Sequence, residues 1–206
     1  MNQAPASTVR PPRPPKQERD ALRRAQIVEA ARQNVLRCGF HAAPMAQIAH
    51  AAGMSVGQIY RYFPSKDTII RAIVEGIIER RLERMANRNE SPCTPERLAA
   101  RTPELDARHA EDAVLMLEIT AEATRHAEIA AIVREADKRS QQQAIAKMLR
   151  LMPGLSPAEA AARCEVVAVL IEGTVFRQPT EMQADRADLE RLYARLLAVL
   201  LEGKDF

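Results

Sequence analysis

The sequence has little of several features that mark large classes of proteins. Its 206 residues include no tryptophan, 7 glycines and 3% aromatic residues. No segment alternates β-branched or aromatic residues with polar ones, which argues against an all-β or α/β fold. No apolar run approaches the roughly 20 residues that span a bilayer, so we expect no transmembrane helix and no membrane partner. The N-terminal residues contain no apolar signal-peptide core, and we therefore expect a cytoplasmic protein.

Cysteine and histidine, on which many metal and catalytic sites depend, are also few. Cys38, Cys93 and Cys164 are widely spaced, which suits reduced thiols better than a disulfide framework or a zinc site. The four histidines lie far apart, and no Gly-rich phosphate loop, His-Glu-x-x-His or Gly-x-Ser-x-Gly motif is present. We therefore expect no metal, no cofactor and no enzymatic activity. An active site assembled from distant residues is the alternative.

Helix formers dominate what is present. Alanine contributes 36 residues, and prolines bracket long stretches in which helices can run. The sequence therefore predicts an all-α fold. The expected helices are an amphipathic one through Ile27 and Val35 that ends near Gly39, short pieces at about 45–52 and after Ser55, long ones at about 65–88, 104–125 and 128–151, one from a Ser156–Glu159 capping box to about 177, and one with a leucine stripe at 189–200. Residues 91–103 are expected to form a connection that holds at most one short helix.

The net charge of +3 conceals an uneven distribution along the chain. Residues 1–66 contain 10 basic and 3 acidic residues, whereas residues 67–206 contain 20 and 24. A basic N-terminal third on a mildly acidic remainder predicts a module that faces nucleic acid, joined to a different domain. Within that third, residues 1–18 are expected to form a disordered, basic, proline-rich tail. The alternative is a basic arm that contacts a DNA groove or backbone.

Residues 44–63 carry the pattern that points to function. Two short helical pieces meet at Gly53, whose freedom to adopt a positive φ suits a tight turn between helices. Ser55 can cap the second piece, while Ile59 and Phe63, four residues apart, face inward. Most of the side chains around them are left pointing outward. The pattern predicts a helix-turn-helix motif with a short second helix.

A series of residues between Arg24 and Glu75 resembles the DNA-binding domain of the tetracycline-repressor (TetR) family of bacterial regulators. The resemblance implies an N-terminal three-helix DNA-binding domain at residues 19–66 and a C-terminal helical ligand-binding and dimerisation domain at residues 67–206. It also implies a homodimer. The matching residues are Ile27 to Ala31, Gly39-Phe40, Ile48-Ala49, Ala52 to Ser55, Gly57, Ile59 to Phe63 and Lys66-Asp67.

The resemblance further implies that the helix starting near Ser55 enters the major groove of DNA. Gln58 can pair with adenine and Arg61 with guanine, and an exposed Lys66 can bind a phosphate. The first helix of the motif begins Ala43-Pro44-Met45, without the serine or threonine that the family often places there, so one hydroxyl contact is missing. The predicted DNA-binding residues are Pro44, Met45, Ser55, Val56, Gly57, Gln58, Tyr60, Arg61, Tyr62 and Lys66.

Dimerisation is also indicated by the apolar residues of the last two helices. The helix at 158–177 is apolar on every side from Val166 to Ile171 and must be covered all round. A two-fold dimer covers it together with the leucine stripe of the last helix, through a four-helix interface. Such a dimer holds two recognition helices ~34–36 Å apart and predicts a near-palindromic operator. The predicted interface residues are Val167, Leu170, Ile171, Leu189, Leu192, Tyr193, Leu196 and Leu200.

An effector pocket is implied by the resemblance rather than by the residues themselves. It is expected among the helices at 65–88, 104–125, 128–151 and 158–177. Methionines offer an adaptable apolar wall, whereas the scarcity of aromatics argues against a stacked cage for flat cations. The predicted lining residues are Met85, His109, Met116, Ile119, His126, Met148, Met152, Cys164, Glu172 and Phe176.

The sequence thus predicts a ligand-responsive transcriptional regulator. We expect a homodimeric repressor that binds a palindromic operator in double-stranded DNA and that a small, mainly lipophilic effector releases. The alternatives are an activator and a helical interaction module without small-molecule induction.

Overall fold

The computed structural model describes residues 15–40, 43–86, 93–101 and 106–202, and within these ranges the regular structure is entirely helical. The predicted all-α fold is therefore confirmed. The helices are α1 (Lys16–Cys38), α2 (Met45–Ala51), α3 (Val56–Tyr60), α4 (Lys66–Ala86), α5 (Pro95–Ala100), α6 (Ala107–Ala123), α7 (Ala127–Leu151), α8 (Pro157–Arg177) and α9 (Arg186–Glu202).

The helix boundaries follow local signals in the sequence. Asp106 accepts a hydrogen bond from the His109 amide and starts α6, three residues later than the predicted limit. Ser156 and Glu159 form the predicted capping box at the start of α8. The disordered tail expected at residues 1–18 extends too far, because α1 already begins at Lys16. Pro15 precedes this helix, and Glu18 lies in its first turn. The rest of that tail, residues 1–14, lies outside the described residues.

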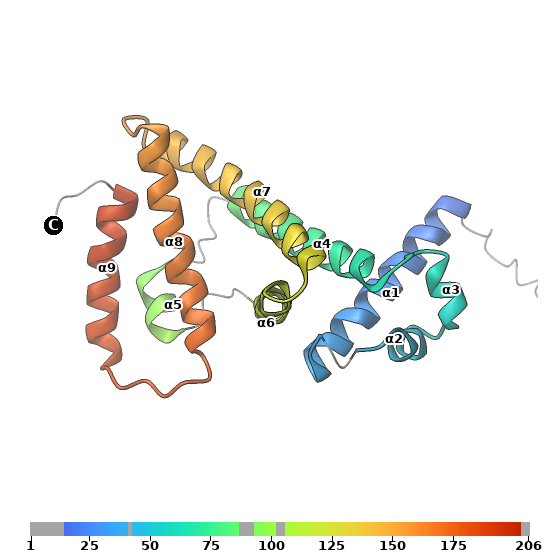
Figure 1. Cartoon of the computed structure of the whole chain (residues 1–206). Coiled ribbons are helices and arrows are strands. Elements are labelled where there is room, and N and C mark those ends of the chain that lie inside the picture. The colour runs from blue at the N-terminus through green and yellow to red at the C-terminus, as the bar shows by residue number, and fades with distance from the viewer. Residues whose placement is uncertain (1–14, 41–42, 87–92, 102–105, 203–206) are drawn as a thin grey trace, which may run out of the picture.

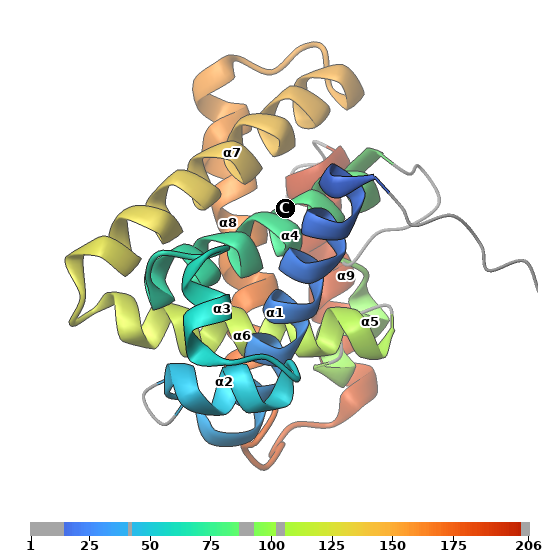
Figure 2. The same cartoon turned by 90° about the vertical axis from the view of Figure 1, so that its right-hand side faces the viewer.

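The helices are arranged along one long direction (Figure 1). The short helices α2 and α3 lie with α1 at one end of the molecule, and α5, α8 and α9 lie at the other. Between them α4 and α7 run side by side. Figure 2, which looks onto the α1–α3 end, shows α6 passing behind α1, and these two helices are in contact. The segment with the predicted helix-turn-helix motif therefore lies at the tip, and α4 and α6 connect it to the body.

One hydrophobic core runs from the tip into the body. Ile59 and Phe63 are almost fully buried near the tip, and the isoleucines of α4 continue the core along the length of that helix. Ile119 of α6 and Ile129 of α7 belong to the same cluster. The core therefore crosses residue 66, where the sequence suggests a domain boundary, and α4 contributes to both sides.

A second core occupies the far end of the molecule. It centres on Cys93, Leu98 and Leu197, so that the short helix α5 packs between α8 and α9. Half of the residues predicted for a dimer interface pack against this cluster within the chain itself but are only partly buried by it, so their part in a dimer interface stays a prediction. These residues are Val167, Leu170, Ile171 and Tyr193.

The three cysteines are free thiols in different surroundings. Cys38 is exposed at the end of α1, whereas Cys93 and Cys164 are buried. Burial raises the pKa of Cys93 to about 11 and also raises the pKa of Cys164. In the part of the chain that the structure describes, no helix combines the length and the apolar character needed to cross a bilayer.

Candidate nucleic-acid interface

The turn between α2 and α3 has the geometry that the sequence predicts. Gly53 adopts a φ of +61°, in the left-handed region that glycine tolerates best. The Met54 amide donates to the Ala49 carbonyl at 2.9 Å, which closes the turn. Gln26 of α1 donates its side-chain amide to the Ala52 carbonyl at 2.8 Å and ties the turn to α1. The helix-turn-helix prediction is therefore confirmed.

A capping box fixes the first turn of α3. The Ser55 hydroxyl accepts a hydrogen bond from the Gln58 amide at 3.2 Å, as its predicted role as a cap requires. In return, the Gln58 side-chain oxygen accepts from the Ser55 amide at 2.8 Å. The spacing Ser-x-x-Gln is the sequence signal of this capping box, in which Gln58 completes the cap predicted at Ser55. A two-bond contact between Gln58 and adenine uses that same oxygen, so the capping box and the base would share it.

The exposed face of α3 is the face that the sequence assigns to DNA. Tyr60 is 49% exposed and Val56 37% exposed, while Ile59 is fully buried. Arg61 is exposed at the C-terminal end of the helix. A small hollow of about 90 Å³ lies beside it, and Arg23 of α1 lines that hollow opposite α3. Arg23 is absent from the sequence-predicted set, because only the tertiary packing of α1 on α3 brings it to this face.

Arg24 of α1 holds the residues that follow the C-terminal end of α3. Its guanidinium donates to the Tyr62 carbonyl and lies over the ring of Phe63, 4.2 Å from the ring centre. Tyr62 itself is half-buried against the core, so its side chain is less available to DNA than the outward position that the pattern predicts. The neighbouring arginines Arg23 and Arg24 of α1 therefore have different surroundings: Arg23 lies beside an open hollow, and Arg24 is bonded to the end of α3.

Lys66 is not exposed as the sequence predicts. Its ammonium donates to the Phe40 carbonyl at 2.6 Å and lies 4.1 Å from the centre of the Phe40 ring. Burial lowers the pKa of Lys66, while the negative charges of Glu122 and Asp67 oppose that shift. One of the three ammonium N–H groups is thus used within the chain, so the ammonium is less available for the predicted phosphate contact. Lys66 instead joins the start of α4 to the end of α1.

The start of α2 also differs in detail from the prediction. Pro44 precedes the helix as its N-terminal capping residue and is exposed, whereas the sequence places it inside the first turn. Met45 is half-buried against the core. Gly57 has open space where a side chain would stand, as expected for the uncrowded start of α3.

Comparison with known proteins places these helices in a family. Residues 27–73 match the family model of bacterial regulatory proteins of the tetR family. This segment of the chain is therefore a helix-turn-helix of the tetR type. The regulator BetI of Escherichia coli is 34% identical to it over 74 residues. That match spans 36% of this chain and only 38% of the length of BetI.

Solved structures extend the likeness to the body of the chain, as a likeness of fold. Salmonella enterica GusR has a TM-score of 0.68 at 23% identity, over 88% of this chain and 96% of GusR. A putative Saccharomonospora viridis regulator in complex with choline has a TM-score of 0.60 at 19% identity, over 86% of this chain and 96% of that one. Bacillus subtilis FadR in complex with stearoyl-CoA has a TM-score of 0.60 at 20% identity, over 88% and 99%.

The ten residues predicted to line an effector pocket lie in two packed clusters and at the surface of the helical body. A hollow of about 370 Å³ lies between α5, α8 and α9, and none of the ten lines it. Five of them contribute to packed clusters instead, because the isoleucines of α4 and the α7–α8 contact fill the space between these helices. Met116 and Ile119 belong to the main core, and Met148, Met152 and Cys164 to a small α7–α8 cluster.

The other five predicted pocket residues lie at the surface or beside carboxylates. His109 contacts the Asp106 carboxylate at 2.9 Å, and His126 contacts Glu122 at 2.7 Å. Phe176 is 67% exposed, and Met85 is half-buried near the end of α4. Glu172 lies on α8, where burial raises the pKa of its carboxyl although part of the residue stays exposed, and Arg81 opposes the shift.

Charged side chains join α1 of the DNA-binding domain to the body. Glu29 of α1 accepts two hydrogen bonds from Arg108 of α6, at 2.7 and 3.1 Å. Arg80 of α4 makes two bonds of 2.8 Å to the carboxylate of Asp112 on α6. Gly39 adds a close approach, since a side-chain carbon there would stand 3.3 Å from the Glu118 carboxylate of α6. These contacts fix the position of α1 against α6, and no sequence motif marks them.

Proposed function

We propose that the chain is a dimeric transcriptional regulator that binds a palindromic operator through α3 and that a small effector releases. The observation that carries the proposal is a complete helix-turn-helix of the tetR family whose second helix turns Tyr60, Arg61 and Gln58 to solvent. The basic N-terminal third of the chain supports electrostatic attraction to the DNA backbone. These features suit a DNA-binding protein rather than an enzyme.

The proposed dimer uses the surface of α8 and α9 that the chain leaves uncovered. Val166 is 46%, Val169 58%, Phe176 67% and Leu192 56% exposed. Large apolar side chains gathered on two neighbouring helices are typical of an interaction surface. A two-fold arrangement of these helices covers them and leaves the α3 tips free. Of the interface residues predicted from the sequence, the proposed interface includes the exposed Leu192. The half-buried Leu196 and Leu200 follow it on the same helix.

The proposed effector acts on the helical body at residues 67–206. Two regulators of the same fold bind choline and stearoyl-CoA, which are chemically very different molecules. An effector that favours one spacing of the recognition helices over another changes the affinity for the operator. The ion pairs between α1 and α6, together with α4, provide contacts through which a shift in the body reaches α3.

The experiment is selection of an operator from random double-stranded DNA, followed by gel-shift titration at two salt concentrations. We expect a palindromic sequence whose binding weakens as salt rises. Arg61→Ala should reduce discrimination at one base pair by about 1–3 kcal/mol. Arg134→Ala, which removes the same charge from the exposed surface of α7, is the matched control and should leave discrimination unchanged. Equal base preferences for all three proteins would contradict the assignment of α3 as the reading helix.

A further inference from the structure

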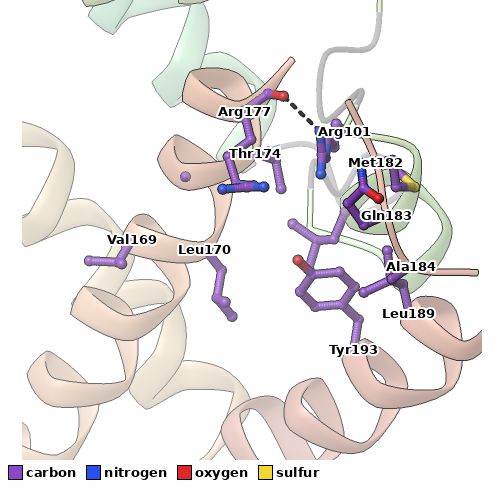
Figure 3. A pocket seen from close by; sticks show the side chains of 12 residues that line it. Arg101, Val169, Leu170, Thr174, Arg177, Met182, Gln183, Ala184, Leu189 and Tyr193 are labelled. Atoms are coloured by element: carbon purple, nitrogen blue, oxygen red, sulfur yellow. Dashed lines mark hydrogen bonds between the residues drawn. The ribbon is translucent and has the colours of Figure 1, made fainter. Parts of the chain in front are cut away.

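A hollow of about 370 Å³ lies at the end of the molecule opposite the DNA-binding motif. It opens between α5, α8 and α9 and the segment that joins the last two helices (Figure 3). Its apolar side is formed by Leu98 of α5, Val169 and Leu170 of α8, and Leu189 of α9. The volume lies near the lower end of the ~300–1,000 Å³ range of small-molecule sites. The hollow can therefore take a compact apolar group.

The charged groups at this hollow are of one sign. Arg101 and Arg177 line it, and no aspartate or glutamate does. A guanidinium nitrogen of Arg101 donates to the carbonyls of Arg177 and Thr180, both at 2.8 Å, and to the Thr180 hydroxyl at 3.0 Å. These acceptors are neutral. Among the described residues no carboxylate is paired with either arginine. Two positive charges beside an apolar surface are therefore available to bind an anion.

The rim of the hollow is held in a fixed shape. Arg101 ends α5 with a φ of +55°, a conformation that residues with a side chain adopt at a cost in energy. Besides the bonds of its guanidinium, its carbonyl accepts from the Gln178 side chain at 3.0 Å. The end of α5 is thus clamped to the end of α8. A rim that is ordered before binding loses little entropy when a ligand enters.

We propose that this hollow binds a small monocarboxylate with an apolar tail. The tail lies against Leu98, Leu170 and Leu189, and the carboxylate accepts hydrogen bonds from Arg177, whose side chain has no acceptor of its own among the described residues. Charge-assisted bonds from a guanidinium are the interaction that a carboxylate recognises best. Val169 lines the hollow and also lies on the surface proposed to meet the second subunit, so an occupant would act on the arrangement of the dimer. The regulatory meaning of the site, but not the binding itself, rests on the proposed function.

The test compares octanoate, 1-octanol and octylamine, which share a chain and differ in the head group, by isothermal titration with the full-length protein. We expect octanoate to bind with the highest affinity of the three. Arg177→Gln should weaken octanoate roughly tenfold or more, because the charged hydrogen bonds are lost. Arg150→Gln, which removes an exposed charge at the far end of α7, should not.

A second variant tests the location without touching a charge. A side-chain carbon added at Gly173 meets no atom within 4 Å, so Gly173→Leu should fill the hollow without disturbing α8. We expect it to abolish octanoate binding while circular dichroism stays as in the parent protein. Octanoate binding that survives in both Gly173→Leu and Arg177→Gln, equal binding of octanol and octanoate, or no binding of octanoate would overturn the proposal.

Operator binding is measured separately, so the two proposals can fail independently. A protein that binds octanoate as described but selects no operator would retain this site and refute the proposed function. A protein that is released from its operator by another ligand, equally well in Gly173→Leu, would retain the proposed function and refute this site as the effector site.

Discussion

Arg32 of α1 and Asp112 of α6 are almost fully buried, and a guanidinium nitrogen of the first lies 2.7 Å from a carboxylate oxygen of the second. The guanidinium of Arg32 makes no aligned hydrogen bond within the described residues, so the contact is electrostatic. Glu29 and Glu111 lie 3.6 and 3.5 Å from the same guanidinium. This pair joins the DNA-binding domain to the body through a buried charge.

Removal of one partner of this pair should destabilise the protein strongly. Asp112→Asn leaves Arg32 buried without its nearest charge and weakens the two bonds from Arg80. We expect a loss of about 3–5 kcal/mol in the free energy of unfolding, the range found when a buried pair is broken. Urea denaturation followed by circular dichroism measures it.

The matched control is Glu111→Gln, which removes a partly exposed carboxylate from the same network. Its expected effect is within about 1 kcal/mol, as for a solvent-accessible ion pair. A double variant, Arg32→Met with Asp112→Leu, should recover part of the loss because no buried charge is left unpaired between α1 and α6. Equal losses for Asp112→Asn and Glu111→Gln would show that the buried pair has no special weight.

Stability should depend on pH through Glu29. The hydrogen bonds from Arg108 lower the pKa of Glu29 from its ordinary 4.5 to about 2, despite the opposing effect of burial. A carboxylate with a lowered pKa in the folded state stabilises the protein above pH 4.5, and this contribution is lost as the pH falls towards 2.

Urea denaturation of Glu29→Gln and the parent protein at several pH values measures this dependence. The difference between them should be largest near pH 6 and should shrink between pH 4.5 and 2. Glu135→Gln, on the exposed surface of α7, should show a difference that does not follow this course. A Glu29→Gln difference that stays constant with pH would contradict the ion pair with Arg108.

Lys66 should support the fold more than it supports DNA binding. Because its ammonium is bonded to the Phe40 carbonyl, Lys66→Gln should lower the free energy of unfolding by about 1 kcal/mol or more. The salt dependence of operator affinity should stay that of the parent protein. The opposite result, unchanged stability with a salt slope reduced by about one, would restore the phosphate contact that the sequence predicts.

The oligomeric state should respond to single changes on the uncovered face of α9. Leu192→Glu replaces an apolar side chain, 56% exposed in the single chain, with a charged one. The monomer should therefore fold normally, whereas the dimer should dissociate because the charge would be buried in the interface. Analytical ultracentrifugation distinguishes the two. Leu151→Glu makes the same change at the end of α7, where the side chain is 70% exposed, and should leave the dimer intact. Monomers in both variants, or in neither, would refute the proposed interface.

Local chemistry explains why the DNA-binding motif could be predicted. Gly53 and Ser55 fix a turn and a cap through their own backbone and side chain, and Ile59 and Phe63 lie four residues apart on one face. All these signals lie within eleven residues. Their outcome depends little on the rest of the chain, and so the sequence alone specifies it.

The features that the sequence could not predict depend on distant partners. The half-burial of Lys66 comes from Phe40, and the second core comes from α5 lying between α8 and α9. Leu170 is equally apolar whether it meets α5 or a second subunit, so periodicity alone cannot choose between them. Arg32 has no hydrophobic signature, and only the approach of α6 makes it a buried residue.

The different exposure of the three thiols makes it possible to measure the separation of the two DNA-binding domains in the proposed dimer. Cys38 stands exposed at the end of α1, on the DNA-binding domain, while burial keeps Cys93 and Cys164 protonated and out of reach of a reagent. The unmodified sequence therefore accepts one spin label or fluorophore per subunit. In a dimer, the two labels report the separation of the DNA-binding domains directly, with and without DNA or ligand.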